Sequence, residues 1–82
     1  MERKVKELTL LLLYLTSWKE EELQELFGET RRSWKGYPFD ILDELTDEDF
    51  IRGSKRSKSV YLTKAGIKEA KEIAKKYQIQ DI

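Results

Sequence analysis

The stretch Phe39–Gly66, FDILDELTDEDFIRGSKRSKSVYLTKAG, decides the fold of this chain. Pro38, directly before it, suits the first position of a helix, where its missing N–H costs nothing. This helix is expected to stop near Asp47–Asp49. Two short strands then follow, Phe50–Gly53 and Ser59–Thr63, with a polar and flexible connection between them. The stretch therefore predicts a helix, a β-hairpin with a charged tip, and the start of another helix.

The end of this stretch leads into a C-terminal helix. Val60 and Leu62 share one face of the second strand and Tyr61 lies on the other. Thr63 is a favourable N-cap for the helix that follows. The residues expected on the buried face of that helix are Ile67, Ala70, Ile73, Ala74 and Tyr77.

The N-terminal segment predicts a helix over Arg3–Thr16 that is apolar on much of its circumference. One apolar face consists of Val5, Leu8, Leu11, Leu12 and Leu15, and a second stripe of Leu10, Leu13 and Tyr14. Both faces need cover. The C-terminal helix of the same chain would cover the second stripe, or a second subunit would do so in a homodimer.

Between these parts, Ser17 and Glu20 match a capping box and predict a short second helix over Trp18–Phe27. Trp18 is expected to hold the first two helices together, and Gly28 suits the position after the helix end. The segment Gly28–Tyr37 is interpreted as a loop, or as a loop with one turn of helix. We expect residues 1–82 to form a single domain that is mainly α-helical with a small β-hairpin.

The composition argues against several classes of protein. The chain of 82 residues contains no cysteine and no histidine, the side chains most used for zinc sites and for catalysis near neutral pH. A chain this short can hardly enclose a substrate pocket. We therefore expect no enzyme activity, no metal and no cofactor. The apolar run near residue 10 is too short to span a membrane, and a cytoplasmic location is expected.

The net charge of zero conceals an uneven distribution along the chain. Residues 40–50 carry six acids and no base, and residues 51–62 carry four bases and no acid. A dedicated DNA-binding domain is often basic overall. The balanced charge therefore argues against strong nonspecific binding to DNA. The local basic segment could still contact phosphates.

The pattern resembles winged helix-turn-helix regulators of the MarR and PadR type. In those proteins a recognition helix ends in a leucine, a few polar residues and an apolar pair, here Leu45, Thr46–Asp49 and Phe50–Ile51. A hairpin wing and a Leu-Thr-x-x-Gly helix start follow, here Leu62–Gly66. The resemblance covers about residues 38–77. It implies a winged helix-turn-helix fold with three helices, a hairpin and a fourth helix, and it implies binding to double-stranded DNA.

The chain departs from this pattern in two ways. Asp49 stands where glycine is usual, and a left-handed Asp costs about 1 kcal/mol. The expected recognition helix also carries Asp40, Asp43, Glu44 and Asp47, whose carboxylates would repel phosphates. The chain is also similar to a small family of uncharacterised microbial proteins, some linked to mobile elements, through Trp34–Leu42 and Lys58–Thr63.

Two basic segments are candidates for contact with nucleic acid. The hairpin offers Arg52, Lys55, Arg56 and Lys58, which would meet phosphates or enter a minor groove. The alternative is a solvated turn whose charges keep an edge hairpin from pairing with other chains. The second segment offers Arg31, Arg32, Trp34 and Lys35, just before the expected recognition helix. Trp34 and Tyr37 are interpreted mainly as core residues, and stacking on bases is the alternative.

Two hypotheses for function follow. In the first, the chain is a DNA-binding protein similar to transcriptional regulators, and it dimerises through Leu10, Leu13, Tyr14 and the C-terminal helix. In the second, it is a winged-helix module that binds protein through its acidic helix and the apolar second stripe of the first helix. The first hypothesis requires that the two basic segments lie side by side in the folded chain.

Overall fold

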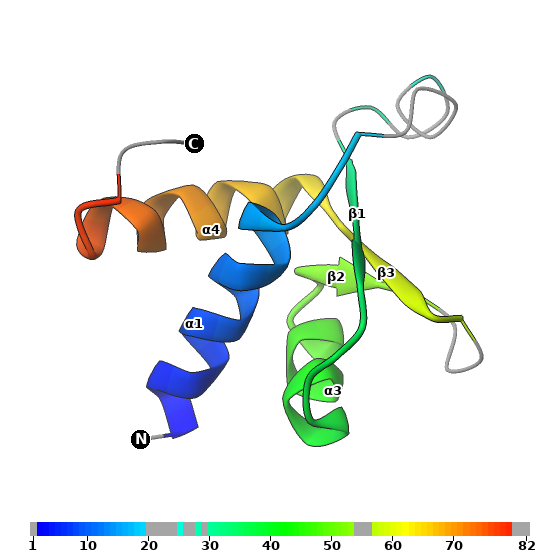
Figure 1. Ribbon diagram of the computed structural model, residues 1–82, viewed down its shortest axis with the longest axis horizontal. Helices are drawn as coiled ribbons and strands as arrows, with labels where there is room; N and C mark the ends of the chain where they lie inside the picture. The colour runs from blue at the N-terminus through cyan, green and yellow to red at the C-terminus, as the bar shows by residue number, and fades with distance from the viewer. Residues whose placement is uncertain (1, 20–24, 26–27, 29, 54–56, 80–82) are drawn as a thin grey trace.

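A computed structural model describes residues 2–19, 25, 28, 30–53 and 57–79 of the chain. The elements in these ranges, shown in Figure 1, are α1 (Glu2–Leu15), β1 (Arg31–Trp34), α3 (Phe39–Asp47), β2 (Ile51–Arg52), β3 (Ser59–Leu62) and α4 (Lys64–Lys76). The described part thus combines three helices with a small antiparallel sheet. This mixed α/β architecture is broadly compatible with a small winged-helix-like fold.

The three strands form one antiparallel sheet in the order β1-β3-β2. Leu62 of β3 lies opposite Arg31 of β1 on one side and Ile51 of β2 on the other. Ile51, Val60 and Leu62 are buried, so they form the inner face of the sheet. The alternation predicted for β3 is therefore confirmed, because Val60 and Leu62 point inward and Tyr61 is only half-buried.

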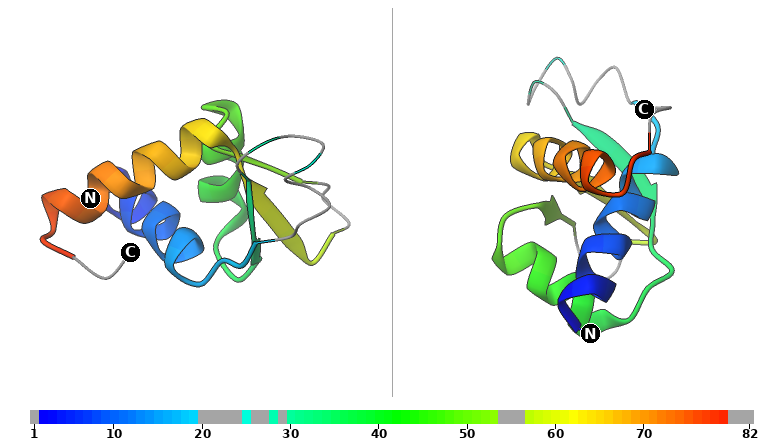
Figure 2. Two further views of the ribbon diagram at one scale, coloured as in Figure 1. Left: turned by 90° about the horizontal axis from the view of Figure 1, so that it is seen from above. Right: turned by 90° about the vertical axis from the view of Figure 1, so that its left-hand side faces the viewer.

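The helices enclose the core against this inner face. α1 and α4 lie on one side of the sheet. α3 lies next to α1 and below the sheet in the view of Figure 1, and Figure 2 shows the same arrangement from two other sides. The buried apolar side chains form one cluster to which all six elements except β1 contribute: Leu10, Leu11, Leu13, Tyr14, Leu42, Leu45, Ile51, Val60, Leu62, Ile67, Ala70, Ile73 and Ala74. The buried face predicted for the C-terminal helix is thus confirmed.

β1 corrects the interpretation of Gly28–Tyr37 as a loop, with or without a helical turn. Residues 31–34, RRSW, contain neither a run of β-branched residues nor an apolar alternation, so the usual sequence signals of a strand are missing. Pairing with β3 makes this segment a strand. Ser33, opposite Val60, is completely buried.

The predicted start of a second helix at Trp18 is wrong. Trp18 forms an antiparallel bridge with Arg32, whose backbone N–H and C=O both bond to it at 2.9 and 2.8 Å. The Ser17 hydroxyl donates to the Tyr14 carbonyl at the end of α1, and Glu20, its expected partner in the capping box, lies outside the described residues. Most of the remainder of Trp18–Phe27 lies outside the described residues.

The position of β1 also separates the expected pair of helices. Residues 35–50 are all described and hold one helix, α3. Any helix further upstream is therefore divided from α3 by a strand. A helix-turn-helix pair directly before the hairpin, as the resemblance implies, is not found in this part of the chain.

The second apolar stripe of α1 is covered within the chain, as in the alternative in which the C-terminal helix packs on it. Leu10 and Leu13 are 1% and 0% exposed and Tyr14 is buried, so the proposed dimer contact through these residues lies inside the core. Of the other predicted face, Leu11 is buried, and the exposed stripe consists of Val5, Leu8, Leu12 and Leu15, each about two-fifths exposed. Both stripes are apolar, and which one faced inward could not be settled from periodicity alone.

Two predicted helix boundaries are confirmed by their local geometry. Thr63 caps α4, since its Oγ1 accepts from the Gly66 N–H at 3.0 Å, and it donates to the Asp49 carbonyl at 2.6 Å. Asp49, after the end of α3, has a positive φ of 63°, as the glycine usual there would. The prediction that Pro38 is the first residue of this helix is wrong by one position, because α3 starts at Phe39 and Pro38 is its N-cap residue.

None of the helices in the described ranges combines the length and the apolar character needed to cross a lipid bilayer.

Candidate nucleic-acid interface

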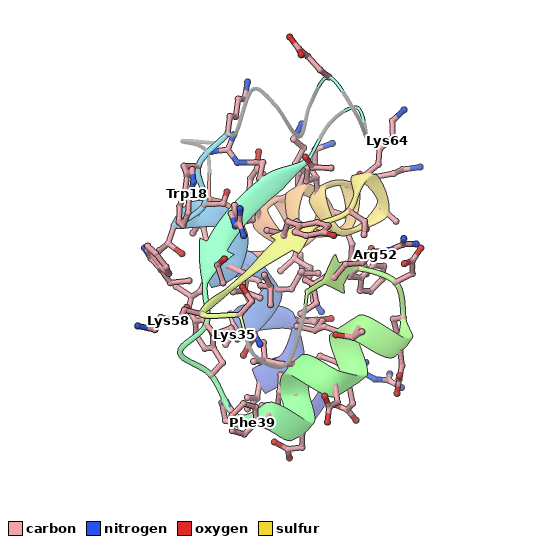
Figure 3. The ribbon with its side chains drawn as sticks, turned by 90° about the vertical axis from the view of Figure 1, so that its right-hand side faces the viewer. Trp18, Lys35, Phe39, Arg52, Lys58 and Lys64 are labelled. Atoms are coloured by element: carbon pink, nitrogen blue, oxygen red, sulfur yellow. The ribbon has the colours of Figure 1, made fainter. Side chains whose placement is uncertain are left out.

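The face of the sheet opposite α1 and α4 is the surface on which the two basic segments meet. We call it the outer face, and Figure 3 looks directly onto it. Since successive side chains point to opposite sides of a strand, the partners of Tyr61 across the sheet point outward with it. These partners are Arg32 on β1 and Arg52 on β2. A row of Arg, Tyr and Arg therefore crosses the outer face.

A direct backbone bond joins the two segments at the other end of the strands. The Lys35 N–H donates to the Lys58 carbonyl at 2.9 Å, and Trp34 lies opposite Ser59. Residues separated by more than twenty positions in the chain are thus neighbours on the sheet. The labels in Figure 3 show Lys35 and Lys58 below the sheet and Arg52 toward its other side.

An aromatic pair lies at the β1 edge of the outer face. Trp34 is 62% exposed, so the expectation that it fills the core is wrong. Its ring packs against Trp18 with centroids 5.2 Å apart and planes tilted by 48°. The alternative interpretation, a ring available for stacking, therefore remains open for Trp34. Tyr37, in contrast, is packed against the core as expected.

The arginines of the outer face are held in place by short-range partners. The Arg32 Nε donates to the Ser59 hydroxyl at 2.8 Å across the strands. Arg52 pairs with Asp49 through its Nε and Nη2 at 3.0 and 2.9 Å, and both side chains of this pair are well exposed. An exposed pair contributes little stability and is easily exchanged for another anion.

Arg31 does not belong to this surface. Its position on β1 turns it toward α1, where its Nε donates to the Ser17 hydroxyl and its Nη2 to the Ser17 carbonyl. Its guanidinium also lies 5.5 Å from the centre of the Tyr14 ring. Arg31 therefore holds the end of α1 to the sheet. Lys55 and Arg56, at the hairpin tip, lie outside the described residues.

Three residues of the outer face were not among the predicted site residues: Trp18, Tyr61 and Lys64. The strand alternation had already indicated that Tyr61 points outward. Trp18 had no such signal, because its place depends on the bridge to Arg32. Lys64, the first residue of α4, lies near the outer face because β3 runs into the helix with one residue between them.

The exposed side of α3 has the opposite charge. Asp40, Asp43, Glu44 and Asp47 are all exposed. Carboxylates at this density oppose the approach of a phosphate backbone. The described part of α3 is therefore a poor recognition helix, and the outer face of the sheet is the better candidate for contact with a polyanion.

A hollow of about 360 Å³ separates α3 from the hairpin. Phe39 and Lys35 stand at its rim, and its floor consists of Leu42, Ile51 and Val60. In the ranges that the structure covers, no group of three or more acidic side chains is arranged to hold a metal ion.

One protein-family model matches nearly the whole chain. The model of a domain of unknown function, DUF6429, matches residues 1–80. The chain belongs to the DUF6429 family. No curated protein and no solved structure gives a significant match. The family name assigns no activity.

Proposed function

We propose that this chain binds nucleic acid, with duplex DNA as its first target, through the outer face of the sheet and the basic hairpin. One observation carries the proposal: the two basic segments are adjacent on the same side of the molecule. Arg32, Lys35, Arg52 and Lys58 come from β1, β2 and the residues flanking the strands. Clustered Lys and Arg side chains supply most of the affinity for a phosphate backbone.

This mode of binding differs from that of the regulators that the sequence resembles. There the recognition helix enters the major groove, whereas here α3 is acidic and exposed. We propose that β1 and the hairpin make the contact and that α3 faces away from the duplex. Trp34, with its exposed ring, would meet a sugar or wedge at a base step at the β1 edge.

The salt dependence of DNA binding tests the proposal. Fluorescence anisotropy with a labelled duplex, from about 50 to 200 mM salt, should show a steep loss of affinity for the wild-type chain. The double variant Arg52→Gln/Lys58→Gln should bind more weakly and reduce the slope of log K against log salt by about 2. The matched control Lys68→Gln/Lys75→Gln removes the same charge from exposed positions on α4 and should leave the slope nearly unchanged.

Equal slopes for the two double variants would show that the outer face is not the binding surface. Negligible binding at the lowest salt would remove the nucleic-acid proposal altogether. A variant of Trp34, Trp34→Ala, adds a charge-independent measurement. It should weaken binding without changing the salt slope, because stacking releases no counterions.

A second candidate function is protein binding, and the exposed stripe of α1 favours it. Val5, Leu8, Leu12 and Leu15 recur at spacings of three and four residues, the a and d positions of a heptad. Such a stripe is complementary to a copy of itself. We therefore propose that it pairs two copies of the chain, in place of the buried Leu10, Leu13 and Tyr14.

Sedimentation equilibrium tests this pairing. The variant Leu8→Glu/Leu12→Glu should convert a dimer to a monomer while circular dichroism remains helical, since both side chains are substantially exposed in the monomer. A wild-type chain that sediments as a monomer at about millimolar concentration would remove the dimer, because pairing weaker than this corresponds to only about 4 kcal/mol.

A further inference from the structure

We propose that a hollow at the junction of the sheet and α4 is a binding site for a phosphate group. The hollow has a volume of about 200 Å³ and is lined by Thr30, Arg52, Tyr61, Thr63 and Lys64. The inference rests on the proposed function for the source of the phosphate, namely a nucleic-acid backbone. The chemistry of the site itself is argued from the residues that line it.

The lining is cationic and rich in hydroxyl groups. Arg52 and Lys64 bring two positive charges, and Thr30 and Tyr61 bring hydroxyl donors. Both cations are exposed at the mouth of the hollow, and Figure 3 shows them on the same side of the outer face. Guanidinium, ammonium and hydroxyl donors together are the groups with which proteins usually bind phosphate oxygens.

One side chain that lines the hollow lacks a hydrogen-bond partner in the part of the chain that the structure describes. Thr30 is 6% exposed, and its Oγ1 has no hydrogen-bond partner among the described residues. A buried hydroxyl without a partner costs about 1–3 kcal/mol. Thr30 directly precedes β1 and lines the hollow together with Arg52 and Tyr61 of the outer face. After rotation of the Thr30 side chain toward the hollow, a phosphate oxygen there would accept the hydrogen bond that this hydroxyl lacks.

The N-terminus of α4 adds an electrostatic field that favours an anion in the hollow. Thr63 and Lys64 line the hollow at the N-terminus of this 13-residue helix. The first N–H groups of a helix have no partner within the helix, and its dipole favours an anion there. The Thr63 hydroxyl satisfies the Gly66 N–H at 3.0 Å. The N–H groups of Lys64 and Ala65 belong to the same first turn, and Lys64 lines the hollow.

The size and the remaining charges of the hollow are consistent with this ligand. At about 30 Å³ per water molecule, 200 Å³ accommodates a phosphate group with some of its hydration. The carboxylate of Asp49 is bonded to the Nε–Nη2 edge of Arg52. The guanidinium carries five N–H donors, so binding a phosphate does not require that this pair break.

A titration with inorganic phosphate, followed by ¹H–¹⁵N NMR at constant ionic strength, tests the site. Saturable shifts are expected at the amides of Thr30, Lys64 and Ala65. Lys64→Gln should weaken binding about tenfold, as expected for the loss of one charge-assisted contact. Lys68→Gln, one turn further along α4 and outside the lining, is the matched control and should leave the affinity unchanged.

Thr30→Val gives a signature that a purely structural threonine would not give. Valine keeps the shape and removes the unpaired hydroxyl, so the melting temperature without phosphate should stay the same or rise. The rise in melting temperature caused by phosphate should shrink. A lower melting temperature without phosphate, together with an unchanged response to phosphate, would overturn the proposal.

The same variants, measured with labelled DNA, identify the source of the phosphate. Weaker DNA binding by Lys64→Gln and Thr30→Val, but not by Lys68→Gln, supports a backbone phosphate in the hollow. Phosphate shifts without any DNA binding support the site as one for a free phosphate ester, while the proposed function fails. DNA binding that is indifferent to both variants, without phosphate shifts at the hollow, overturns the site and leaves the proposed function standing.

Discussion

At the scale of single residues, Gly66 shows why the Leu-Thr-x-x-Gly motif has the form it has. A Cβ on Gly66 would overlap the backbone carbonyl of Phe50. Three residues earlier in the chain, the Thr63 N–H donates to that carbonyl at 3.0 Å. The first turn of α4 therefore packs directly on the backbone between α3 and β2, and only glycine permits this approach.

Substitution of this glycine should be costly. Gly66→Ala is expected to lower the free energy of unfolding by about 3 kcal/mol, because the obstacle is backbone that cannot rotate away. Gly36→Ala is the control, since nothing lies within 4 Å of the added Cβ and its φ is not positive. It should change stability by less than about 1 kcal/mol. Urea denaturation measures both, and similar values would contradict the packing described here.

Asp49 tests how much the left-handed conformation costs this chain. Both Asp49→Gly and Asp49→Ala remove the exposed pair with Arg52, so the difference between them isolates the backbone. The alanine variant should be about 1 kcal/mol less stable than the glycine variant, because φ is 63°. Thermal or urea unfolding gives the difference. Equal stabilities would indicate that the segment relaxes to a negative φ.

At the scale of elements, the predictable parts were those fixed by local chemistry. The end of α3, the hairpin strands and the Thr63 cap follow from turn residues, alternation and capping, and all are present. β1 was missed because RRSW becomes a strand only through its partner β3. The cover of the second stripe of α1 was left open between the C-terminal helix and a second subunit, because two apolar stripes compete and only the partner helices decide between them.

The candidate site was predictable to a similar degree. The hairpin and Arg32–Lys35 could be named from charge, but their adjacency depends on the register of β1 with β3. Arg31 and Arg32 are neighbours in the chain, but their side chains point to opposite faces of the sheet. Arg31 therefore binds Ser17 and does not belong to the outer face. Without knowing that residues 31–34 form a strand, this phase could not be assigned.

The contact between α1 and α4 predicts a pH dependence of stability. The Lys76 ammonium bonds to Glu7 at 3.1 Å and, with the Tyr77 hydroxyl at 3.2 Å, holds the pKa of Glu7 below its usual value. A lowered pKa in the folded state means that this stabilisation is present above the unfolded pKa of Glu7 and is lost as the pH falls through the folded value.

Glu7→Gln should therefore be less stable than the wild type at pH 7, and the difference should shrink on acidification below the ordinary carboxyl range. Melting temperatures measured from neutral to acidic pH follow this difference. Glu69→Gln, at an exposed position on α4, is the control and should show less pH dependence. A constant gap between Glu7→Gln and wild type at all pH values would mean that the ion pair does not form in solution.

At the scale of the whole molecule, the charges are divided between two surfaces. The outer face of the sheet is basic, and the exposed side of α3 is acidic. Such a division orients a charged partner even when the net charge is zero. It also explains how a chain with no net charge could bind a polyanion at one surface.

Neutralising the acidic surface should strengthen DNA binding if the proposed function holds. The variant Asp40→Asn/Asp43→Asn/Asp47→Asn is expected to bind DNA several-fold more tightly at about 50 mM salt, because long-range repulsion is removed. The gain should largely disappear at about 200 mM, where exposed charges are screened beyond about 8 Å. Anisotropy titrations at both concentrations measure it. An equal gain at both would point to direct contact between α3 and DNA.

A single residue, Thr63, stands between the last residue of β3 and the first of α4. β3 and α4 are therefore connected without a flexible linker. Their junction is fixed where Gly66 packs on the Phe50 backbone. We expect β3 and α4 to unfold together as one cooperative unit. In native-state hydrogen exchange, the amides of β3 and α4 should acquire the same opening free energy, and a hinge at residue 63 would appear as two distinct values.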